Sequence, residues 1–173
     1  MIELREAQFS DYAAIAKLHA ESWKQNYRGI YSDHFLDNEV EQDRSDVWHQ
    51  RLQFPSKNQR VTIATQDGSI VGFSCLYYND DPNFGSLLDN LHISTSVQGS
   101  GIGTLLIRSC ATQIFDNCTS DKMYLWVYES NIKARKFYER LGGVKLETVE
   151  KQNPDQTLSR VCRYIWNDVS ALL

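Results

Sequence analysis

The feature that most constrains this chain is a short glycine-rich stretch between two apolar segments. It has the sequence Gln98-Gly99-Ser100-Gly101-Ile102-Gly103. Residues 87–94 before it predict a strand, and apolar residues at helical spacing predict a helix from Gly101 to about Phe115. Glycines let a backbone approach a bulky anion closely, and the free N–H groups at the positive end of a helix bind negative charge. The stretch therefore predicts a turn that binds a pyrophosphate.

Two other kinds of phosphate-binding loop are excluded by the residues present. A Walker loop ends in Gly-Lys-Ser/Thr, and no lysine follows Gly103. A dinucleotide-binding loop that began at Gly99 would need a third glycine at position 104, which is Thr104. The stretch also follows a predicted hairpin, whereas a dinucleotide loop belongs to an opening strand-helix-strand unit. On this motif alone, a tight turn without a ligand is the alternative.

The remaining elements predict a mixed sheet. In chain order we expect a strand at 2–6, helices at 10–23 and 39–53, strands at 61–66, 69–78 and 87–94, a helix at 101–115, a strand at 122–128, a helix at 131–141, and strands at 144–151 and 157–166. Asp67-Gly68 is a strong hairpin signal, residues 80–85 predict a loop, and Asn153-Pro154-Asp155-Gln156 predicts a closing hairpin. Because these hairpins exclude a purely parallel sheet, we expect an α/β (α+β) fold. Its sheet is mixed, mostly antiparallel and six- to seven-stranded, with helices on both faces.

Length and charge limit what such a fold can bind. The 173 residues suffice for one buried core, so a single domain over residues 1–173 is expected. Hydrophobic residues make up 42% and charged residues 23%, which is ordinary for a globular protein. The formal net charge of −4 disfavours nucleic acid as a partner, because phosphate backbones are held through broad basic faces.

Neither a membrane segment nor a metal site is expected from the sequence. No run of about 18 apolar residues occurs, and the N-terminus lacks the apolar core of a signal peptide. A cytoplasmic protein without membrane contact is therefore expected. The four cysteines are scattered, with no histidine at zinc-ligand spacing near them, and predict reduced thiols.

Two motifs, in order along the chain, carry a resemblance to a known family. Gln98-x-x-Gly101-x-Gly103 matches the pattern Gln/Arg-x-x-Gly-x-Gly/Ala, and Asn131-x-x-Ala134-x-x-Phe137-Tyr138-x-x-x-Leu141-Gly142 follows it. Both resemble the cofactor motifs of the GNAT superfamily of N-acetyltransferases. The run Glu21-Ser22-Trp23-x-x-x-Tyr27-x-Gly29-Ile30 is similar to a common variety of these enzymes, so the resemblance covers nearly the whole chain. One departure is Ser94-Thr95-Ser96, where relatives often carry proline, and it concerns loop geometry.

The resemblance implies an enzyme that transfers an acetyl group from acetyl-coenzyme A to a primary amine of a small molecule or peptide. The strands at 87–94 and 122–128 would diverge, with the pantetheine arm between them. By resemblance, Asn131 would form a hydrogen bond with the pantetheine chain. Asn131 is also a helix N-cap candidate, and these two roles can coexist. The residues implied to bind coenzyme A are Leu91, His92, Ile93, Gln98, Gly99, Ser100, Gly101, Ile102, Gly103, Thr104, Asn131, Ala134, Phe137 and Tyr138.

The resemblance also implies catalytic roles for three residues. Tyr138 would protonate the departing thiolate, because a phenol and a thiol have comparable basicity; plain packing beside Phe137 is the alternative. The backbone N–H of Ile93 would stabilise the charge that develops on the acyl oxygen. Asp89 would accept the proton of an ammonium substrate through water; a carboxylate at a loop edge, or one that only binds the substrate, is the alternative. Alternation along the strand places Asp89 on the same side as Leu91 and Ile93 unless a bulge intervenes.

The histidines have weaker claims to a role. His92 is a second candidate for the base by its pKa, although a histidine on a half-buried strand usually packs and forms hydrogen bonds. His19, His34 and His49 lie outside the motifs. We expect these three at helix surfaces or at the edge of the core, with no catalytic role.

The first helix and the segment after it supply the predicted acceptor site. Trp23, Tyr27 and Tyr31 are aromatic residues of this region, which by resemblance overhangs the acceptor, and Asp89 would complete the substrate contacts. Aromatic faces attract a cationic amine, whereas core packing is the alternative for Trp23.

The sequence also allows a second hypothesis for function and two for the assembly of the chain. A protein of the same fold could bind or sense acyl-coenzyme A without catalysis. A homodimer is common in the family, and Tyr164 and Trp166 near the chain end belong either to such an interface or to the core.

Overall fold

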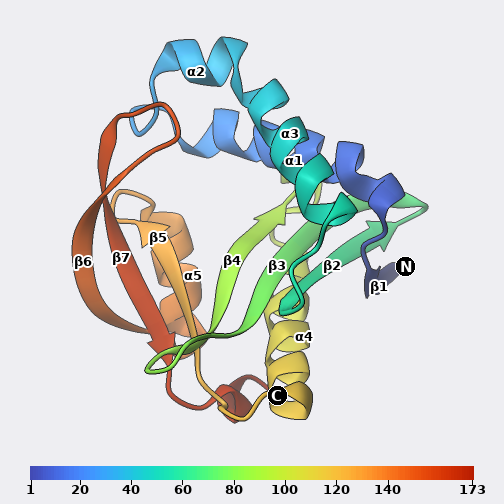
Figure 1. The fold of residues 1–173 in the computed structure, drawn as a ribbon, viewed down its shortest axis with the longest axis vertical. Coiled ribbons are helices and arrows are strands. Elements are labelled where there is room, and N and C mark those ends of the chain that lie inside the picture. Colours follow the sequence, from blue (N-terminus) through green and yellow to red (C-terminus); the bar gives the residue numbers. More distant parts are fainter.

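The sheet has seven strands in the order β1-β2-β3-β4-β5-β7-β6, with helices on both of its faces (Figure 1). The computed structural model describes residues 1–173. Every neighbouring pair is antiparallel except β4 and β5. The predicted mixed, mostly antiparallel sheet is confirmed. The elements are β1 (Ile2–Glu6), α1 (Tyr12–Asn26), α2 (Asp33–Asn38), α3 (Val40–Gln53), β2 (Gln59–Gln66), β3 (Ser69–Asp81), β4 (Gly85–Ile93), α4 (Ile102–Asn117), β5 (Met123–Tyr128), α5 (Ile132–Arg140), β6 (Val144–Gln152) and β7 (Leu158–Trp166).

The helix α2 is an element that the sequence pattern did not predict. It has six residues, too few to display helical periodicity. Its local signal is Ser32, whose hydroxyl caps the helix by accepting a hydrogen bond from the amide of Phe35 at 3.2 Å. Phe35 and Leu36 bury their side chains under α2 and hold it in place.

The loop predicted at residues 80–85 is instead the tip of a long hairpin. Strand β3 extends to Asp81, which pairs with Gly85 at the start of β4. The Asp81 carboxylate accepts hydrogen bonds from the amides of Asn83 and Phe84 at 2.7 and 3.1 Å. The turn was correctly predicted, but it is shorter than expected. The hydrogen bonds of the Asp81 side chain stabilise a tight turn, so strand pairing extends to Asp81 and Gly85.

The two faces of the sheet are covered by different helices. Helices α4 and α5 pack on one face, where Ile107, Ile114 and Tyr138 join a core that includes Tyr164 and Trp166. Both of these last two residues are buried, so they belong to the core of the chain. Helices α1 and α3 cover the other face over β2 to β4. No helix of this chain combines the length and the apolar character that a membrane crossing requires.

Strands β4 and β5 separate soon after they meet. Their parallel pairing consists of Ser86 with Met123 and Leu87 with Tyr124. The amide of Ser86 anchors this seam by donating to the carbonyl of Lys122 at 3.0 Å. Beyond Leu87 the two strands diverge, so each presents an unpaired backbone edge to the space between them.

Substitution of Gly85 tests how much the fold depends on this seam. Gly85 has a φ of +81°, and a Cβ atom there would lie 2.3 Å from the carbonyl oxygen of Lys122. We expect Gly85→Ala to lower the free energy of unfolding by about 3 kcal/mol, because strain and a backbone clash coincide. The measurement is urea denaturation followed by circular dichroism.

Gly68→Ala is the matched control for this experiment. Gly68 has a φ of +79° in the β2–β3 turn, but a Cβ atom there meets nothing within 4 Å. The strain alone costs about 1–2 kcal/mol. Equal losses in the two variants would contradict the proposed role of the seam.

Candidate active site

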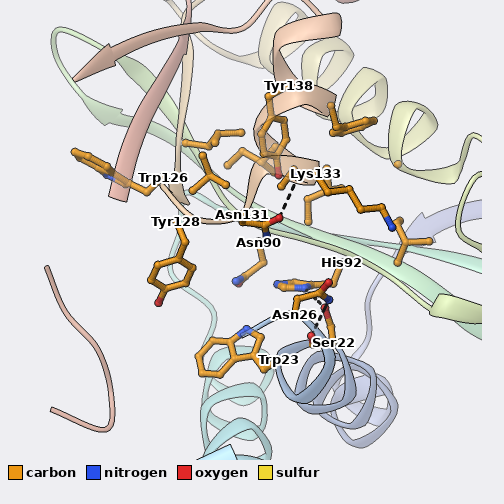
Figure 2. Close-up of a pocket in the computed structure, with 18 of the residues that line it drawn as sticks. Ser22, Trp23, Asn26, Asn90, His92, Trp126, Tyr128, Asn131, Lys133 and Tyr138 are labelled. Carbon is orange, nitrogen blue, oxygen red and sulfur yellow. Dashed lines mark hydrogen bonds between the residues drawn. The ribbon is translucent and has the colours of Figure 1, made fainter. Parts of the chain in front are cut away.

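A cavity of about 710 Å³ opens where β4 and β5 diverge (Figure 2). One end lies at the glycine stretch and the start of α5. The other end lies between α1, α3 and the turn that joins β6 to β7. The cavity therefore joins the predicted cofactor and acceptor regions into one continuous space.

The glycine stretch has the geometry of an anion-binding turn. Gly101 is the N-cap of α4 with a φ of +86°, a conformation that glycine adopts without strain. A Cβ atom on Gly103 would lie 3.3 Å from the Phe137 ring, so glycine allows α4 and α5 to approach closely. The amides of Ile102, Gly103 and Thr104 donate to no acceptor within the chain. They point from the positive end of the helix, where an anion binds favourably.

Nearly all of the predicted loop residues line the cavity. Ser100 does not line the cavity, and its hydroxyl donates to the carbonyl of Val97. A basic residue that the sequence analysis missed joins the loop: Lys133 of α5 donates to the side chain of Gln98 at 2.7 Å. The residues of the stretch that line the cavity are Gln98, Gly99, Gly101, Ile102, Gly103 and Thr104.

The backbone of β4 presents alternate amides to the gap. The amide of Ser94 donates to the carbonyl of Val71 in β3 at 2.8 Å. In an antiparallel ladder, alternate residues direct their N–H and C=O groups to opposite neighbours. The amides of Leu91 and Ile93 therefore point away from β3 and toward β5. Both residues line the cavity.

A β-bulge places Asp89 on the opposite face from Leu91 and Ile93. Cys75 pairs with Asn90 and Leu76 pairs with Leu88, which leaves Asp89 as the extra residue. The predicted alternation is therefore wrong at this point, for the reason that the sequence left open. The carboxylate of Asp89 faces α3, where Arg51 donates to it at 2.9 Å. Among the residues that line the cavity, Asp89 is the one carboxylate.

Tyr138 lies on the α5 side of the cavity. Its ring packs against Phe137 and Trp166, with centroid distances of 5.3 and 6.1 Å, and its hydroxyl forms no hydrogen bond within the chain. Figure 2 shows Tyr138 pointing toward the space beside Asn131. Burial raises the pKa of Tyr138, so the phenol is protonated at neutral pH. The ring of Tyr138 therefore packs in the core while the residue also lines the cavity.

Asn131 has the structural role that its position predicts. Its side-chain oxygen accepts from the amide of Ala134 at 3.2 Å and caps α5. The side-chain nitrogen of Asn131 donates to nothing in the chain. Asn131, Ala134 and Phe137 all line the cavity.

The predicted aromatic residues of the acceptor region differ in their access to the cavity. Trp23 and Tyr27 line it, whereas Tyr31 is buried behind the wall and bonds the hydroxyl of Tyr128 at 2.7 Å. The Arg44 guanidinium lies 4.2 Å from the centre of the Trp23 ring. One face of Trp23 is therefore already covered by a cation.

The turn between β6 and β7 closes the acceptor end of the cavity. The side chain of Asn153 accepts from Tyr128 at 3.0 Å and donates to the carbonyl of Ile30 at 3.4 Å. The amide of Ser32 donates to Asp155 of the same turn at 2.6 Å. These bonds attach the turn to the segment between α1 and α2.

Two histidines contact each other between α1 and β4, with ring centroids 4.3 Å apart. His19 was expected at a helix surface or at the edge of the core, but it is fully buried, so this expectation is wrong. The indole N–H of Trp48 donates a hydrogen bond to the Nδ1 atom of His19 at 2.9 Å. Because an indole nitrogen can only donate, Nδ1 is the acceptor and the ring proton of His19 is on Nε2. His92 lines the cavity, and its Nδ1 lies 2.9 Å from the Ser22 hydroxyl. Burial, reinforced by Arg44, lowers the pKa of His92 to about 3.

The basic side chains of the cavity wall were missed by the sequence analysis. Lys133 occupies the first turn of α5, where the helix dipole disfavours a cation, and this placement was a usable signal. Arg44 and Arg51 are seven residues apart on α3 and therefore share one helix face. The basic residues that line the cavity are Arg44, Arg51, Lys133, Arg140 and Lys151.

Comparisons with known proteins agree with this geometry. A model of the acetyltransferase (GNAT) family matches residues 15–143. The chain is 26% identical over 135 residues to the uncharacterized N-acetyltransferase YuaI of Bacillus subtilis, which covers 76% of this chain and 74% of that protein. It is 28% identical over 81 residues to a spermine/spermidine N(1)-acetyltransferase of the same organism, which covers 44% of this chain and 53% of that one. The PaiA N-acetyltransferase of Thermoplasma acidophilum, solved in complex with coenzyme A, matches with a TM-score of 0.71 and 19% identity over 94% of this chain and 98% of that one. This last likeness shows the fold.

The buried neutral state of His92 makes stability depend on pH. An unfolded histidine titrates near pH 6.5, so between that pH and about 3 the unfolded chain binds a proton that folded His92 does not. The free energy of unfolding therefore falls as the pH drops below 6.5, by up to about 1.4 kcal/mol per pH unit for each such histidine. In His92→Gln we expect the slope between pH 6 and pH 5 to decrease by about 1 kcal/mol per unit. Urea denaturation at each pH measures it, and an unchanged slope would contradict the buried neutral state.

Proposed function

Since the chain belongs to the acetyltransferase (GNAT) family, we propose that it transfers the acetyl group of acetyl-coenzyme A to a primary amine by direct attack in a ternary complex. Residues 1–173 would act as a single domain, because the sheet that supports the site extends from β1 to β7. A relative with the name of an N-acetyltransferase supports an amine as the acceptor. A solved structure of the same fold in complex with coenzyme A supports the cofactor.

The cofactor end of the cavity suits coenzyme A. The free amides of Ile102, Gly103 and Thr104 would bind the pyrophosphate, and Lys133 and Arg140 would add positive charge beside it. The unpaired edge of β4 offers the amides of Leu91 and Ile93 to the pantetheine arm, as a sheet edge binds an extended peptide. Asn131 has a free side-chain nitrogen for the same arm.

The observation that carries the proposal is that Asp89, Ile93 and Tyr138 all line the cavity between β4 and β5. Acetyl-coenzyme A supplies a thioester carbonyl that an amine can attack. The amide of Ile93 would donate to the acyl oxygen, where negative charge develops. Tyr138 would give its proton to the departing sulfur, because burial keeps this phenol protonated.

Asp89 is the group that we propose to accept the proton of the amine. It is the one carboxylate among the residues that line the cavity. His92 also lines the cavity, but its Nδ1 atom lies 2.9 Å from the Ser22 hydroxyl, and burial lowers its pKa to about 3. A proton would first pass from the ammonium to Asp89 through water, which frees the lone pair of the nitrogen. As the nitrogen–carbon bond then forms and the carbon–sulfur bond breaks, Tyr138 would protonate the sulfur and the second proton of the nitrogen would leave to solvent.

Substitution of Tyr138 tests the proposed acid. We expect Tyr138→Phe to lower kcat about 100- to 1,000-fold, because general acid catalysis contributes on this scale. Release of the coenzyme A thiol from acetyl-coenzyme A, with a panel of amines, measures turnover. Calorimetry with coenzyme A should give the same Kd as wild type. Full turnover at all pH values in the variant would exclude Tyr138 as the acid.

Substitution of Gly101 tests the proposed anion-binding turn. At a φ of +86° an alanine is strained by about 1–2 kcal/mol, so the turn should relax and its amides should lose their common direction. We expect Gly101→Ala to raise the Kd for coenzyme A about tenfold in calorimetry. Gly68→Ala is the control, since it has the same strain in a hairpin outside the cavity. Equal affinity in Gly101→Ala would place the pyrophosphate elsewhere.

A further inference from the structure

The acceptor end of the cavity carries an unusual arrangement of charge. Arg44 and Arg51 enter from α3, and Lys151 enters from β6, where its ammonium lies 3.7 Å from the centre of the Trp126 ring. Asp89 is the only carboxylate that lines the cavity together with these three cations. A polyamine would need several carboxylates in such a space, because each of its ammonium groups must be paired when it leaves water.

The chain satisfies only part of the hydrogen-bonding capacity of the Arg51–Asp89 ion pair. The Nη1 atom of Arg51 donates to Asp89 and to the side chain of Asn90, both at 2.9 Å. The Nε and Nη2 atoms of Arg51 donate to nothing in the chain, and one carboxylate oxygen of Asp89 accepts from nothing. About 27% of the Arg51 side chain and 30% of the Asp89 side chain are exposed. Both residues line the cavity, and each has hydrogen-bonding atoms for which the chain supplies no partner.

A cation and an anion side by side complement a ligand that carries a negative group for the cation and a positive group for the anion. An α-amino acid carries its ammonium and its carboxylate on one carbon atom. Its carboxylate matches the free Nε and Nη2 fork of Arg51, which can donate two parallel hydrogen bonds. Its ammonium matches the free oxygen of Asp89. The pair is held in position by the bulge at Asp89 and by Asn90, which Figure 2 shows directed into the cavity.

The remaining cations favour the same kind of ligand. Arg44 donates to Asp43 through Nε and Nη2, while its Nη1 atom has no partner in the chain. Lys151 forms no ion pair, and burial together with the charge of Arg163 lowers its pKa. Both groups disfavour a second positive charge on the ligand and tolerate a negative one.

We propose that the acceptor is a free α-amino acid, bound as a zwitterion by the open edges of the Arg51–Asp89 pair. The inference rests on the proposed acetyl transfer to an amine and names the class of that amine. It predicts that the carboxylate of the acceptor contributes directly to recognition. The α-amide of an amino acid and the N-terminus of a peptide lack this carboxylate and should be poorer acceptors.

The test compares each L-amino acid with its own α-amide. The amide keeps the side chain and the amine but loses the carboxylate charge. With acetyl-coenzyme A at saturation, we expect kcat/KM for the best amino acid to exceed that of its amide by about 10- to 100-fold, the scale of a charge-assisted hydrogen bond. Spermidine should be a worse acceptor than this amino acid. An amide or a polyamine that equals or exceeds every amino acid would overturn the proposal.

The arginine variant assigns this preference to a residue. In Arg51→Gln we expect the ratio of kcat/KM between acid and amide to fall to near one. This ratio is insensitive to a general loss of activity, which affects both substrates equally. Arg60→Gln is the matched control, because Arg60 lies on β2 outside the cavity, and it should keep the wild-type ratio. A wild-type ratio in Arg51→Gln would also overturn the proposal.

A binding experiment separates this inference from the proposed function. Calorimetric titration of the same acid and amide pairs into the protein saturated with coenzyme A requires no turnover. If no amine releases thiol but the acids bind at least about tenfold tighter than their amides, the zwitterion site stands and acetyl transfer fails. If amides release thiol and bind as tightly as acids, transfer stands and the zwitterion site fails.

Discussion

The separation of β4 from β5 is the constraint on which the rest of the molecule depends. Two residue pairs hold the strands together at Ser86 and Leu87, and beyond them each strand has an open edge. Open edges in the middle of a sheet leave backbone groups unpaired, which is costly unless water or a ligand binds them. The gap thus creates a cavity lined by backbone donors, and α4 adds its own unpaired amides at one end. At this end of the cavity, the donors without a partner in the chain are thus mainly main-chain amides.

Much of this arrangement could be predicted from the sequence. The Gln98–Gly103 stretch has a backbone requirement that few residue types satisfy, and two of its glycines do have a positive φ. The Asp67-Gly68 turn also has a positive φ at both residues, as a tight hairpin requires. Such local signals are reliable because the conformation depends on the residues themselves. The order of the strands and helices, apart from the short helix α2, followed from these signals and from the spacing of apolar residues.

The features that could not be predicted depend on contacts between distant segments. The bulge at Asp89 exists only relative to its partner strand, because it is the mismatch between Cys75–Asn90 and Leu76–Leu88 that defines it. Alternation within one strand cannot detect it. Arg44 and Arg51 share a face of α3, but nothing in their spacing indicates that β4 and β6 lie opposite. The burial of His19 likewise depends on Trp48, which approaches from another helix.

The turn between β6 and β7 has a consequence for how this protein can change over evolutionary time. It reaches the segment after α1 through the side chains of Asn153 and Asp155, while the cofactor end is built from α4, α5 and the backbone of β4. The turn therefore belongs to the acceptor end alone, whereas β4 borders both ends of the cavity. A changed turn sequence would alter the wall at the acceptor end while leaving α4 and α5 in place.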